Sequence, residues 1–405
     1  MEGLDKRAPF TATGGIIPPE FRNIKTPCYI LDEKALIKNA KLLGEVAERT
    51  GCKMLLAQKA FSNYDCYQFF EPYLAGTEAS GLFEARLGAE EMPEKEVHVF
   101  CAGYRADEFE ELLQYADHIV FNSPTQLLRF GPGAKEAGKS VGLRINPECS
   151  TQDGHEIYDP CAPGSRMGTT RAQWDEAFQK NPELLDLLEG IHFHTLCEQD
   201  SDDLETTLVF VKKHFGDLAS RVKWINFGGG HHITRPGYDI ERLERCIRMA
   251  KDEWKVEVYL EPGEAWALNA GFLLTRVLDV LKNGKTEIAI IDASAACHMP
   301  DVLEMPYRPP LLGADDTEED RITVRLGGPT CLSGDIIGDY SFSEPLKYGD
   351  ILMFGDMAIY TTCKNNTFNG MPLPDIWLRH GDKTMERLTD FGYEDFKGRL
   401  GRCRK

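Results

Sequence analysis

Residues 97–146 read VHVFCAGYRADEFEELLQYADHIVFNSPTQLLRFGPGAKEAGKSVGLRIN, and this stretch decides the fold. Three short apolar runs in it, Val97–Cys101, His118–Phe121 and Val141–Asn146, alternate with two charged amphipathic segments, Ala106–Gln114 and Pro124–Glu136. Short runs rich in Val, Ile and Phe are typical of buried strands, and the longer segments between them are typical of helices. The alternation predicts repeated βα units around a parallel sheet.

The same alternation extends on both sides, from about residue 50 to residue 265. It adds five strand candidates, at Met54–Lys59, Thr77–Ser80, Gly190–His194, Lys223–Phe227 and Val256–Leu260. It also adds helix candidates at 84–90, 171–187, 204–214 and 240–251. Eight strands with helices between them describe a (β/α)8 barrel, for which about 250 residues is usual. We therefore predict an α/β protein with a TIM-like barrel.

The remainder of the chain predicts a second domain. After Phe272 the sequence changes to alternating strand patterns, such as Arg321–Leu326 and Asp350–Phe354, separated by Gly and Pro clusters. We assign residues 31–270 to the barrel and 271–405 to a β-rich C-terminal domain. Residues 1–30 form an N-terminal extension whose strand, Thr26–Leu31, is expected to pair with the β-rich domain. The acidic run 315–320 is expected to be a solvated connection.

The composition of the chain excludes several classes of function. With 42% hydrophobic and 27% charged residues, the 405-residue chain is not a disordered one. A formal net charge of -19 disfavours nucleic acid and anionic lipid as partners and favours a cationic small molecule. Neither a signal peptide nor a run of about 18 apolar residues occurs, so we expect a cytoplasmic protein with no membrane partner. The 12 cysteines contain no Cys-x-x-Cys pair, which predicts reduced thiols.

Polar residues at the ends of the apolar runs are the candidates for an active site, because barrel enzymes place their chemistry at the carboxyl ends of the strands. Lys59 ends the first run. An ammonium there is paired with a carboxylate, exposed at the barrel mouth, or used chemically. His192 and His194 end the sixth run and face the same side of a strand. They are satisfied core histidines, a metal-binding pair, or an imidazole beside a cofactor.

Two further strand ends complete this candidate site. Gly228–Gly230 follow the seventh run, where barrels commonly present backbone N–H groups to a phosphate; a plain tight turn is the alternative. Glu261 ends the eighth run, and Pro262 fixes the exit of the chain there; a salt-bridge partner is the alternative. A lysine, a carboxylate and a glycine-lined phosphate site on one rim are together what pyridoxal 5′-phosphate requires. We therefore predict this cofactor and no metal site.

Seven strings in the sequence resemble one known family, the pyridoxal-phosphate-dependent decarboxylases of alanine-racemase-like fold. That family includes ornithine, diaminopimelate and carboxynorspermidine decarboxylases, and the resemblance is strongest to the carboxynorspermidine branch. It runs from about Thr26 to the C-terminus. The strings are QKA (58–60), GIHFHT (190–195), NFGGGHH (226–232), EPGEA (261–265), DASA (292–295), HMPDVLEMPY (298–307) and GPTCLSGD (328–335).

The resemblance implies roles for the residues at matching positions. Lys59 would hold the aldehyde of pyridoxal phosphate, and Glu261 would keep the ring nitrogen protonated so that the ring accepts electrons. The other implied cofactor-binding residues are His194 on the ring, Gly228, Gly229, Gly230 and Tyr360 at the phosphate, and Arg144 near the site. Cys331 would protonate the carbanionic carbon after carbon dioxide leaves, whereas an ordinary buried thiol is the alternative. Because the family supplies this cysteine from the neighbouring subunit, the resemblance implies a homodimer with shared active sites.

Two departures from the family pattern bear on the substrate. Glu264 stands where ornithine and diaminopimelate decarboxylases usually have arginine, and Leu332 stands where ornithine decarboxylases have aspartate. Both match the carboxynorspermidine branch, so the implied reaction is decarboxylation of carboxynorspermidine or carboxyspermidine to norspermidine or spermidine in polyamine biosynthesis. Carboxylates must meet the positive charges of such substrates. The expected substrate-binding residues are Asp292, Glu264, Asp335 and Asp301, with Asp292 first.

Four alternatives remain open on the sequence. The first is decarboxylation of a related basic amino acid, namely diaminopimelate, ornithine or lysine. The second is a racemase on the same cofactor, against which Gly-Pro-Thr-Cys argues. The third is a non-catalytic cofactor carrier, which would need neither Cys331 nor Asp292. The fourth is a metal-dependent hydrolase using His192 and His194, although such enzymes usually carry this pair on the first strand.

Overall fold

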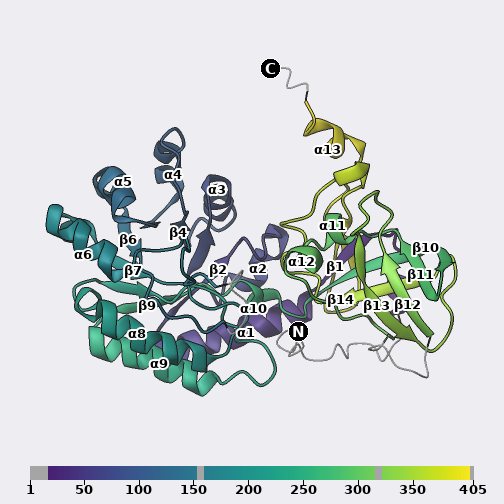
Figure 1. Ribbon diagram of the computed structural model, residues 1–405, viewed down its shortest axis with the longest axis horizontal. Coiled ribbons are helices and arrows are strands. Elements are labelled where there is room, and N and C mark those ends of the chain that lie inside the picture. The colour runs from purple at the N-terminus through teal and green to yellow at the C-terminus, as the bar shows by residue number, and fades with distance from the viewer. Residues whose placement is uncertain (1–16, 153–158, 315–321, 402–405) are drawn as a thin grey trace. The chain divides into compact units, whose positions relative to one another are not determined.

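The computed structural model describes residues 17–152, 159–314 and 322–401 (Figure 1). The chain divides into two compact units. The barrel unit holds residues 38–59 and 66–266, and the sheet unit holds the other described residues. The segment 60–65, which directly follows Lys59, thus belongs to the sheet unit. This insertion is the main difference from the domain boundaries expected at residues 31 and 271.

Eight parallel strands close a barrel in the barrel unit, which confirms the predicted fold class. The strands follow one another in chain order, and the first and last close the ring through the pair Lys53 and Tyr259. They are β2 (Lys53–Ala57), β3 (Gly76–Ala79), β4 (Glu96–Phe100), β5 (His118–Phe121), β6 (Ser140–Arg144), β7 (Gly190–His192), β8 (Trp224–Asn226) and β9 (Glu257–Leu260). All eight neighbouring pairs are parallel, so their carboxyl ends meet at one rim.

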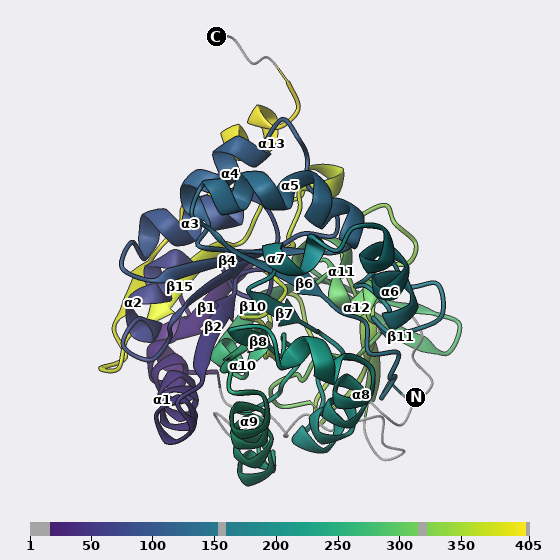
Figure 2. The ribbon, with the colours of Figure 1, turned by 90° about the vertical axis from the view of Figure 1, so that its left-hand side faces the viewer.

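Helices surround these strands (Figure 2). They are α1 (Glu33–Thr50), α2 (Tyr67–Phe70), α3 (Leu82–Glu91), α4 (Phe109–Tyr115), α5 (Pro124–Glu136), α6 (Arg171–Lys180), α7 (Leu184–Leu187), α8 (Ser201–Ala219), α9 (Ile240–Trp254) and α10 (Glu264–Ala267). Ser123 begins α5 by accepting a hydrogen bond from the Gln126 N–H, and Pro124 suits the first turn. The prediction of a single helix over 171–187 is wrong. Pro182 has no N–H and restricts Asn181, so α6 ends before it.

The strands at two site positions end earlier than the sequence predicts. β2 ends at Ala57 and β7 ends at His192, each two residues before the expected ends at Lys59 and His194. The ladders stop with the pairs Ala57–Glu78 and His192–Asn226, beyond which no strand partner continues. Lys59 and His194 therefore lie in the loops at the carboxyl rim.

Trp224 fills the interior of the barrel together with Leu55, Val120 and Tyr259. Its ring passes directly over two glycines. A Cβ atom would lie 2.0 Å from the Trp224 ring at Gly190 and 2.4 Å from it at Gly142. Glycine at these two positions thus makes room for the large interior side chain, as close packing requires.

The sheet unit contains one curled mixed sheet. Its order is β13-β12-β11-β10-β1-β15-β16, and β14 pairs with β10. The strands are β1 (Cys28–Asp32), β10 (Gly271–Asn283), β11 (Thr286–Ile291), β12 (Ile322–Gly327), β13 (Ile336–Phe342), β14 (Ile351–Gly355), β15 (Asp375–Arg379) and β16 (Met385–Arg387). β1, the strand expected at 26–31, is antiparallel to β10 and parallel to β15. The short helices are α11 (Ala295–His298), α12 (Asp301–Glu304) and α13 (Tyr393–Gly398).

Three further expectations concern the cysteines, membrane-spanning helices and two segments of the chain. The eleven described cysteines are free thiols. Among the described residues, no helix combines the length and the apolar character that crossing a membrane demands. The acidic run 315–320 and residues 1–16 of the expected N-terminal extension lie outside the described residues.

Candidate active site

Lys59 lies just beyond β2, at the carboxyl rim of the barrel. Its Nζ is 2.7 Å from Oε2 of Glu78 on β3, and the two side chains are 33% and 2% exposed. Burial disfavours charge on Lys59, but the carboxylates of Glu78 and Glu261 outweigh it and raise the pKa of Lys59 above its ordinary value. The amine is therefore held as an ammonium within an acidic environment.

Glu78 is a site residue that the sequence reasoning missed. It lies opposite Ala57 of β2 in the ladder, which brings its carboxylate to Lys59. Burial raises the pKa of Glu78, although the Lys59 ammonium opposes the shift. The available signal was the one that selected Lys59, namely an ionisable residue near the end of an apolar run.

Glu261 follows β9 and is 3% exposed. Its Oε2 lies 3.0 Å from Nε2 of His192, and its Oε1 accepts a hydrogen bond of 2.7 Å from Nδ2 of Asn226. Burial disfavours the carboxylate, but His192 and Lys59 more than compensate and hold the pKa of Glu261 below its ordinary value. Two adjacent strands thus fix an ionised carboxylate at the rim.

His194 is held as a neutral imidazole. Its Nδ1 accepts a hydrogen bond of 3.0 Å from the Gly229 N–H, so this nitrogen carries no proton. Burial, together with the charge of Arg144, holds the pKa of His194 well below its ordinary value. A flat, uncharged ring is therefore fixed beside the glycine loop.

The loop Gly228–Gly230 can contain only glycine at two of its positions. Gly228 and Gly230 have φ angles of 70° and 81°, in the left-handed region. A Cβ atom would lie 2.4 Å from the Phe193 carbonyl oxygen at Gly228 and 2.1 Å from the Leu196 carbonyl oxygen at Gly230. The loop is packed backbone to backbone, which leaves a rim without side chains where an anionic group can approach.

Arg144 lies at the end of β6, behind this site. Its Nη2 donates a hydrogen bond of 3.1 Å to the His194 carbonyl oxygen, and its guanidinium lies 4.5 Å from the centre of the Phe100 ring. Burial lowers the pKa of Arg144 to about 10. These contacts position the chain at His194.

Glu264 is bonded to His232, and both belong to the barrel unit. Burial disfavours charge on His232, but the Glu264 carboxylate outweighs it and raises the pKa of His232. Because these residues follow the glycine loop and the Glu-Pro-Gly turn, the pair flanks the candidate phosphate position.

The residues at this rim fit pyridoxal phosphate. The aldehyde needs an amine, the ring nitrogen needs a carboxylate and the phosphate needs closely approachable backbone. Lys59, Glu261 and Gly228–Gly230 supply these groups at the carboxyl rim of one closed barrel, and the glycine loop brings no side chain to that rim. His194 adds a flat neutral ring.

The interpretation of His192 and His194 as a metal pair finds no support in their contacts. His192 is bonded to Glu261, and His194 accepts from the Gly229 N–H. Within the described ranges, neither histidine belongs to a group of three side chains spaced to hold a metal ion.

Cys331 lies in the sheet unit, in the loop between β12 and β13. It is exposed, and its N–H donates a hydrogen bond of 2.6 Å to Oδ1 of Asn369. Asp335 holds this loop, since its Oδ1 accepts from the Ala295 N–H at 2.7 Å and its Oδ2 accepts from the Thr330 hydroxyl at 2.7 Å. The predicted substrate residue Asp335, 3% exposed, is thus the anchor of the Cys331 loop.

The other predicted residues of the sheet unit have local partners as well. Asp292 accepts hydrogen bonds from the hydroxyls of Thr26 and Thr275, at 2.6 and 2.5 Å, and from the Arg276 N–H. Asp301 is bonded to Lys364. Tyr360 has a φ angle of 48°, and its N–H donates to the Ala60 carbonyl oxygen at 2.9 Å.

The structure therefore gathers one set of predicted residues at the barrel rim. These are Lys59, Arg144, His194, Gly228, Gly229, Gly230, Glu261 and Glu264. A second set lies in the sheet unit, namely Asp292, Asp301, Cys331, Asp335 and Tyr360.

Comparisons with known proteins match almost the whole chain. The family described as "Pyridoxal-dependent decarboxylase, C-terminal sheet domain" matches residues 28–358. The carboxynorspermidine/carboxyspermidine decarboxylase of Campylobacter jejuni is 40% identical, with 93% of this chain and 98% of the relative covered. The carboxyaminopropylagmatine decarboxylase of Synechocystis is 38% identical, with 95% and 97% covered.

A solved structure agrees with these matches. Carboxynorspermidine decarboxylase from Campylobacter jejuni, complexed with norspermidine, has a TM-score of 0.84 and 38% identity, with 93% of this chain and 100% of that chain covered. Taken with the lysine, carboxylate and glycine loop at the barrel rim, the matches show that this chain belongs to the family of pyridoxal-dependent decarboxylases.

Proposed function

We propose that this decarboxylase acts on carboxynorspermidine and carboxyspermidine and releases norspermidine and spermidine, as a step of polyamine biosynthesis. The observation that carries the proposal is the likeness, at 38% identity, to a solved decarboxylase complexed with norspermidine. The net charge of -19 suits a substrate with several ammonium groups. Residues at matching positions would then perform the chemistry.

Pyridoxal phosphate, when bound, supplies the ring that accepts the electron pair left when carbon dioxide departs. Lys59 would hold the cofactor covalently through its side-chain nitrogen, once the ammonium that Glu78 and Glu261 favour has lost a proton. Glu261, kept ionised by His192, would hold a proton on the ring nitrogen. His194 would lie flat on the ring, and the N–H groups of the glycine loop would bind the phosphate, with Tyr360 as a further phosphate contact.

Cys331 would return a proton to the α-carbon after decarboxylation. Its thiol is exposed on a loop held by Asp335, which suits a group that must reach a substrate. We propose that this thiol serves the site of the neighbouring subunit in a homodimer. We also propose a cytoplasmic location for the enzyme.

Asp301 is the strongest candidate for binding a distal ammonium of the substrate. One of its partners is the ammonium of Lys364, which a substrate ammonium can replace like for like. Asp292 and Asp335 each accept from backbone N–H groups, which a substrate cannot replace without leaving them unpaired. Glu264 is bonded to the buried imidazole of His232.

Product analysis tests the proposed substrate. The purified holoenzyme is incubated separately with carboxynorspermidine, carboxyspermidine, ornithine, lysine and diaminopimelate, beside the Lys59→Ala and Cys331→Ala variants. Release of norspermidine or spermidine by the wild type, with loss in both variants, supports the proposal. The matched control is Cys246→Ala on α9, which should retain activity. Carbon dioxide from ornithine, lysine or diaminopimelate alone would overturn the substrate assignment.

Complementation tests the shared active site. If Cys331 serves the neighbouring subunit, an equal mixture of Lys59→Ala and Cys331→Ala chains that exchange subunits should recover about a quarter of wild-type activity. Half of the dimers in such a mixture are mixed, and each mixed dimer has one intact site. A mixture that stays inactive although exchange is shown by mass spectrometry would contradict the shared site.

A second substrate follows from a specific relative. The Synechocystis protein, 38% identical, is named for carboxyaminopropylagmatine, whose distal group is a guanidinium. A carboxylate such as Asp301 can bind a guanidinium as well as an ammonium. Adding carboxyaminopropylagmatine to the product assay ranks the candidate substrates. Faster turnover of this compound than of carboxynorspermidine or carboxyspermidine would favour it as the substrate.

A further inference from the structure

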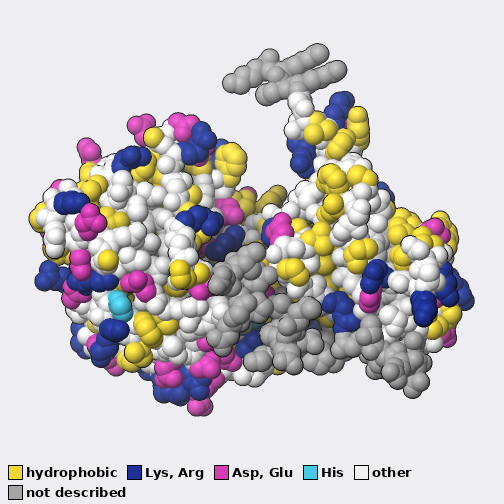
Figure 3. Space-filling view, in the orientation of Figure 1, with side chains coloured by type: hydrophobic (Ala, Val, Ile, Leu, Met, Phe, Trp, Pro, Cys, Tyr) yellow, Lys and Arg dark blue, Asp and Glu magenta, His cyan; other side chains and the backbone are white. Residues whose placement is uncertain are grey.

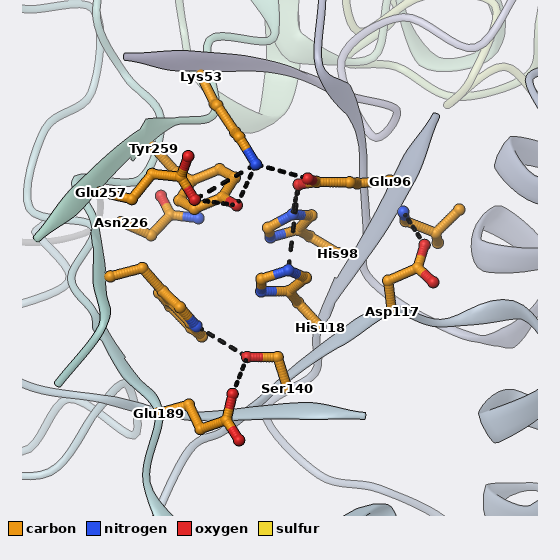
Figure 4. A network of polar contacts seen from close by, with 12 residues as sticks. Lys53, Glu96, His98, Asp117, His118, Ser140, Glu189, Asn226, Glu257 and Tyr259 are labelled. Atoms are coloured by element: carbon orange, nitrogen blue, oxygen red, sulfur yellow. Dashed lines mark hydrogen bonds and ion pairs between the residues drawn. The ribbon is translucent and has the colours of Figure 1, made fainter. Parts of the chain in front are cut away.

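Asn226 is the last residue of β8, and its side chain is fully buried. Side chains alternate along a strand, so Asn226 lies on the same side as Trp224, which fills the barrel interior. Figure 4 shows the Asn226 side chain pointing into the barrel beside Tyr259. An amide in such a place needs partners for its hydrogen-bonding groups, because an unpaired buried amide is costly.

The two ends of the Asn226 amide bind two different elements of the candidate cofactor site. Asn226 lies opposite Tyr259 in the ladder between β8 and β9, which brings Glu261, two residues further on, within reach. Oδ1 of Asn226 accepts a hydrogen bond of 2.8 Å from the Gly228 N–H, and Nδ2 donates one of 2.7 Å to Oε1 of Glu261. An N–H can only donate and an ionised carboxylate can only accept, so the amide fits in one orientation. One planar group therefore joins the glycine loop to the carboxylate.

The bond to Gly228 by itself would be an ordinary turn. An asparagine that accepts the N–H two residues ahead forms an Asx turn, which is a common local structure after a strand. Aspartate would accept that N–H equally well. The amide, unlike an ionised aspartate, also offers a donor to Glu261. This second contact goes beyond what a turn needs, and it points to a role in the cofactor site.

The contacts of Glu261 orient its carboxylate and leave its charge in place. The second oxygen, Oε2, lies 3.0 Å from Nε2 of His192. Burial lowers the pKa of His192, so this ring is neutral and its Nε2 carries the proton that faces the carboxylate. Two neutral donors, Asn226 and His192, thus hold one oxygen each. A carboxylate oxygen has two lone pairs, so a further donor can still bind.

We propose that Asn226 is a positioning residue that holds the glycine loop and the Glu261 carboxylate in one fixed relation. This role rests on the proposed function, in which the loop binds the phosphate and Glu261 binds the ring nitrogen. The phosphate and the ring belong to one small cofactor, so the groups that bind them must stand at a set separation. The Asn226 amide, bonded to both groups, fixes that separation.

Two substitutions separate the two contacts of the amide. Asn226→Leu removes both hydrogen bonds with little change in volume, whereas Asn226→Asp keeps an acceptor for the Gly228 N–H. Each full-length apoprotein is titrated with pyridoxal phosphate and followed by visible absorbance. We expect Asn226→Leu to weaken cofactor binding about tenfold, because the loop loses the bond that fixes its first N–H. Asn226→Asp should weaken binding less.

The ring nitrogen supplies a second readout in the holoenzyme. With pyridoxal phosphate that carries ¹⁵N in the ring, the ¹⁵N chemical shift reports whether this nitrogen is protonated. In Asn226→Leu the Glu261 carboxylate loses one of its two donors and its orientation, so the signal should move toward the unprotonated value. In Asn226→Asp the introduced carboxyl adds negative charge beside Glu261, so the signal should stay at the protonated value. A role in packing alone would move both variants in the same direction.

Glu261→Gln is the reference for the ¹⁵N signal, and Ser140→Ala is the matched control. The Ser140 hydroxyl accepts a hydrogen bond of 2.9 Å from Nε1 of Trp224, so its loss disturbs a contact of β8 at the amino end of the barrel. Ser140→Ala should leave both cofactor affinity and the ¹⁵N signal unchanged. The unfolding temperature of each variant shows that the chain is folded, and Asn226→Ala takes the place of Asn226→Leu if the latter does not fold.

A positioning role for Asn226 is excluded if Asn226→Leu matches the wild type in cofactor affinity and ¹⁵N signal. It is also excluded if Asn226→Leu and Asn226→Asp change both readouts alike. In either case, a shifted signal in Glu261→Gln would leave the proposed role of Glu261 standing. An unshifted signal in Glu261→Gln would overturn that role and the role of Asn226 with it.

Discussion

Lys59 and Glu78 form an ion pair, with 2.7 Å between Nζ and Oε2, that joins the loop after β2 to the neighbouring strand β3. The pair lies at the rim where Glu261 also stands, so one cation is shared by two buried carboxylates. This arrangement favours the protonated form of the amine that we propose to hold the cofactor.

Glu78→Gln should lower the pKa of the Lys59 nitrogen, because the carboxylate that favours its protonated form is removed. The pH midpoint of the visible cofactor band of the holoenzyme should therefore fall. Glu84→Gln is the matched control, since Glu84 acts on Lys59 only through space and contributes less. An unchanged midpoint in Glu78→Gln would show that the ion pair does not survive cofactor binding.

Gly230→Ala should lower the unfolding free energy more than an alanine substitution at another glycine with a left-handed backbone conformation. Gly230 and Gly237 have φ angles of 81° and 85°, but only the added Cβ at Gly230 meets backbone, 2.1 Å from the Leu196 carbonyl oxygen. Gly237→Ala should cost about 1–2 kcal/mol of unfolding free energy through backbone strain.

The same change at Gly230 should cost about 1–3 kcal/mol more and weaken cofactor binding. Urea unfolding of the apoprotein and absorbance titration with pyridoxal phosphate measure the two effects. Equal stabilities for the two variants would mean that the loop can move away from the added atom.

Asp335→Asn should lower kcat about tenfold without changing cofactor affinity. Asp335 accepts the hydrogen bonds that hold the loop of Cys331, so the substitution should leave the thiol poorly oriented. Thr330→Val, which removes one of these hydrogen bonds, should have a smaller effect in the same direction. Steady-state kinetics separate kcat from KM. A selective rise in KM would instead assign Asp335 to substrate binding.

His298 predicts a pH dependence of stability in the sheet unit. It is fully buried as a neutral ring, with Nδ1 accepting from the Ser294 N–H and Nε2 bonded to the Pro372 carbonyl oxygen. Burial lowers its pKa from 6.5 to about 4. The unfolded chain takes up a proton below pH 6.5 and the folded chain does not, so stability is complete above pH 6.5 and falls as the pH drops toward 4.

The loss should reach about 1.4 kcal/mol per pH unit, and His298→Gln should flatten this slope. Urea unfolding between pH 7.5 and 4.5 measures it. His380→Gln is an opposite control, since Glu33 and Glu386 raise the pKa of His380, and its contribution is lost as the pH rises. A His298→Gln variant with the wild-type slope would show that other groups dominate the acid side.

Much of the barrel could be predicted because each strand and helix is a local pattern. All eight apolar runs are strands, and family membership confirms both the predicted cofactor and the predicted decarboxylase class. The helix expected over 171–187 is wrong because one proline outweighs a continuing amphipathic pattern. The exact strand ends at Lys59 and His194 were missed because they depend on where neighbouring strands stop pairing.

The site could be predicted only in part. The sequence could place Lys59, Gly228–Gly230 and Glu261 at the carboxyl rim, because each ends or follows an apolar run and the carboxyl ends of barrel strands meet there. Glu78 was missed because its role depends on lying opposite Ala57. The three hydrogen bonds of Asp292 were equally hidden, since two of their donors lie on β10 and the third, Thr26, lies far away in the sequence, just before β1.

The sequence by itself determined the alternation of strands and helices, the β-rich second unit and the identity of the residues at each strand end. Only the tertiary structure decided which of these residues meet. It paired Lys59 with Glu78 and His192 with Glu261. The physical reason is that periodicity acts within one element, whereas the partners of a buried charge are set by the register between strands and the closure of the barrel.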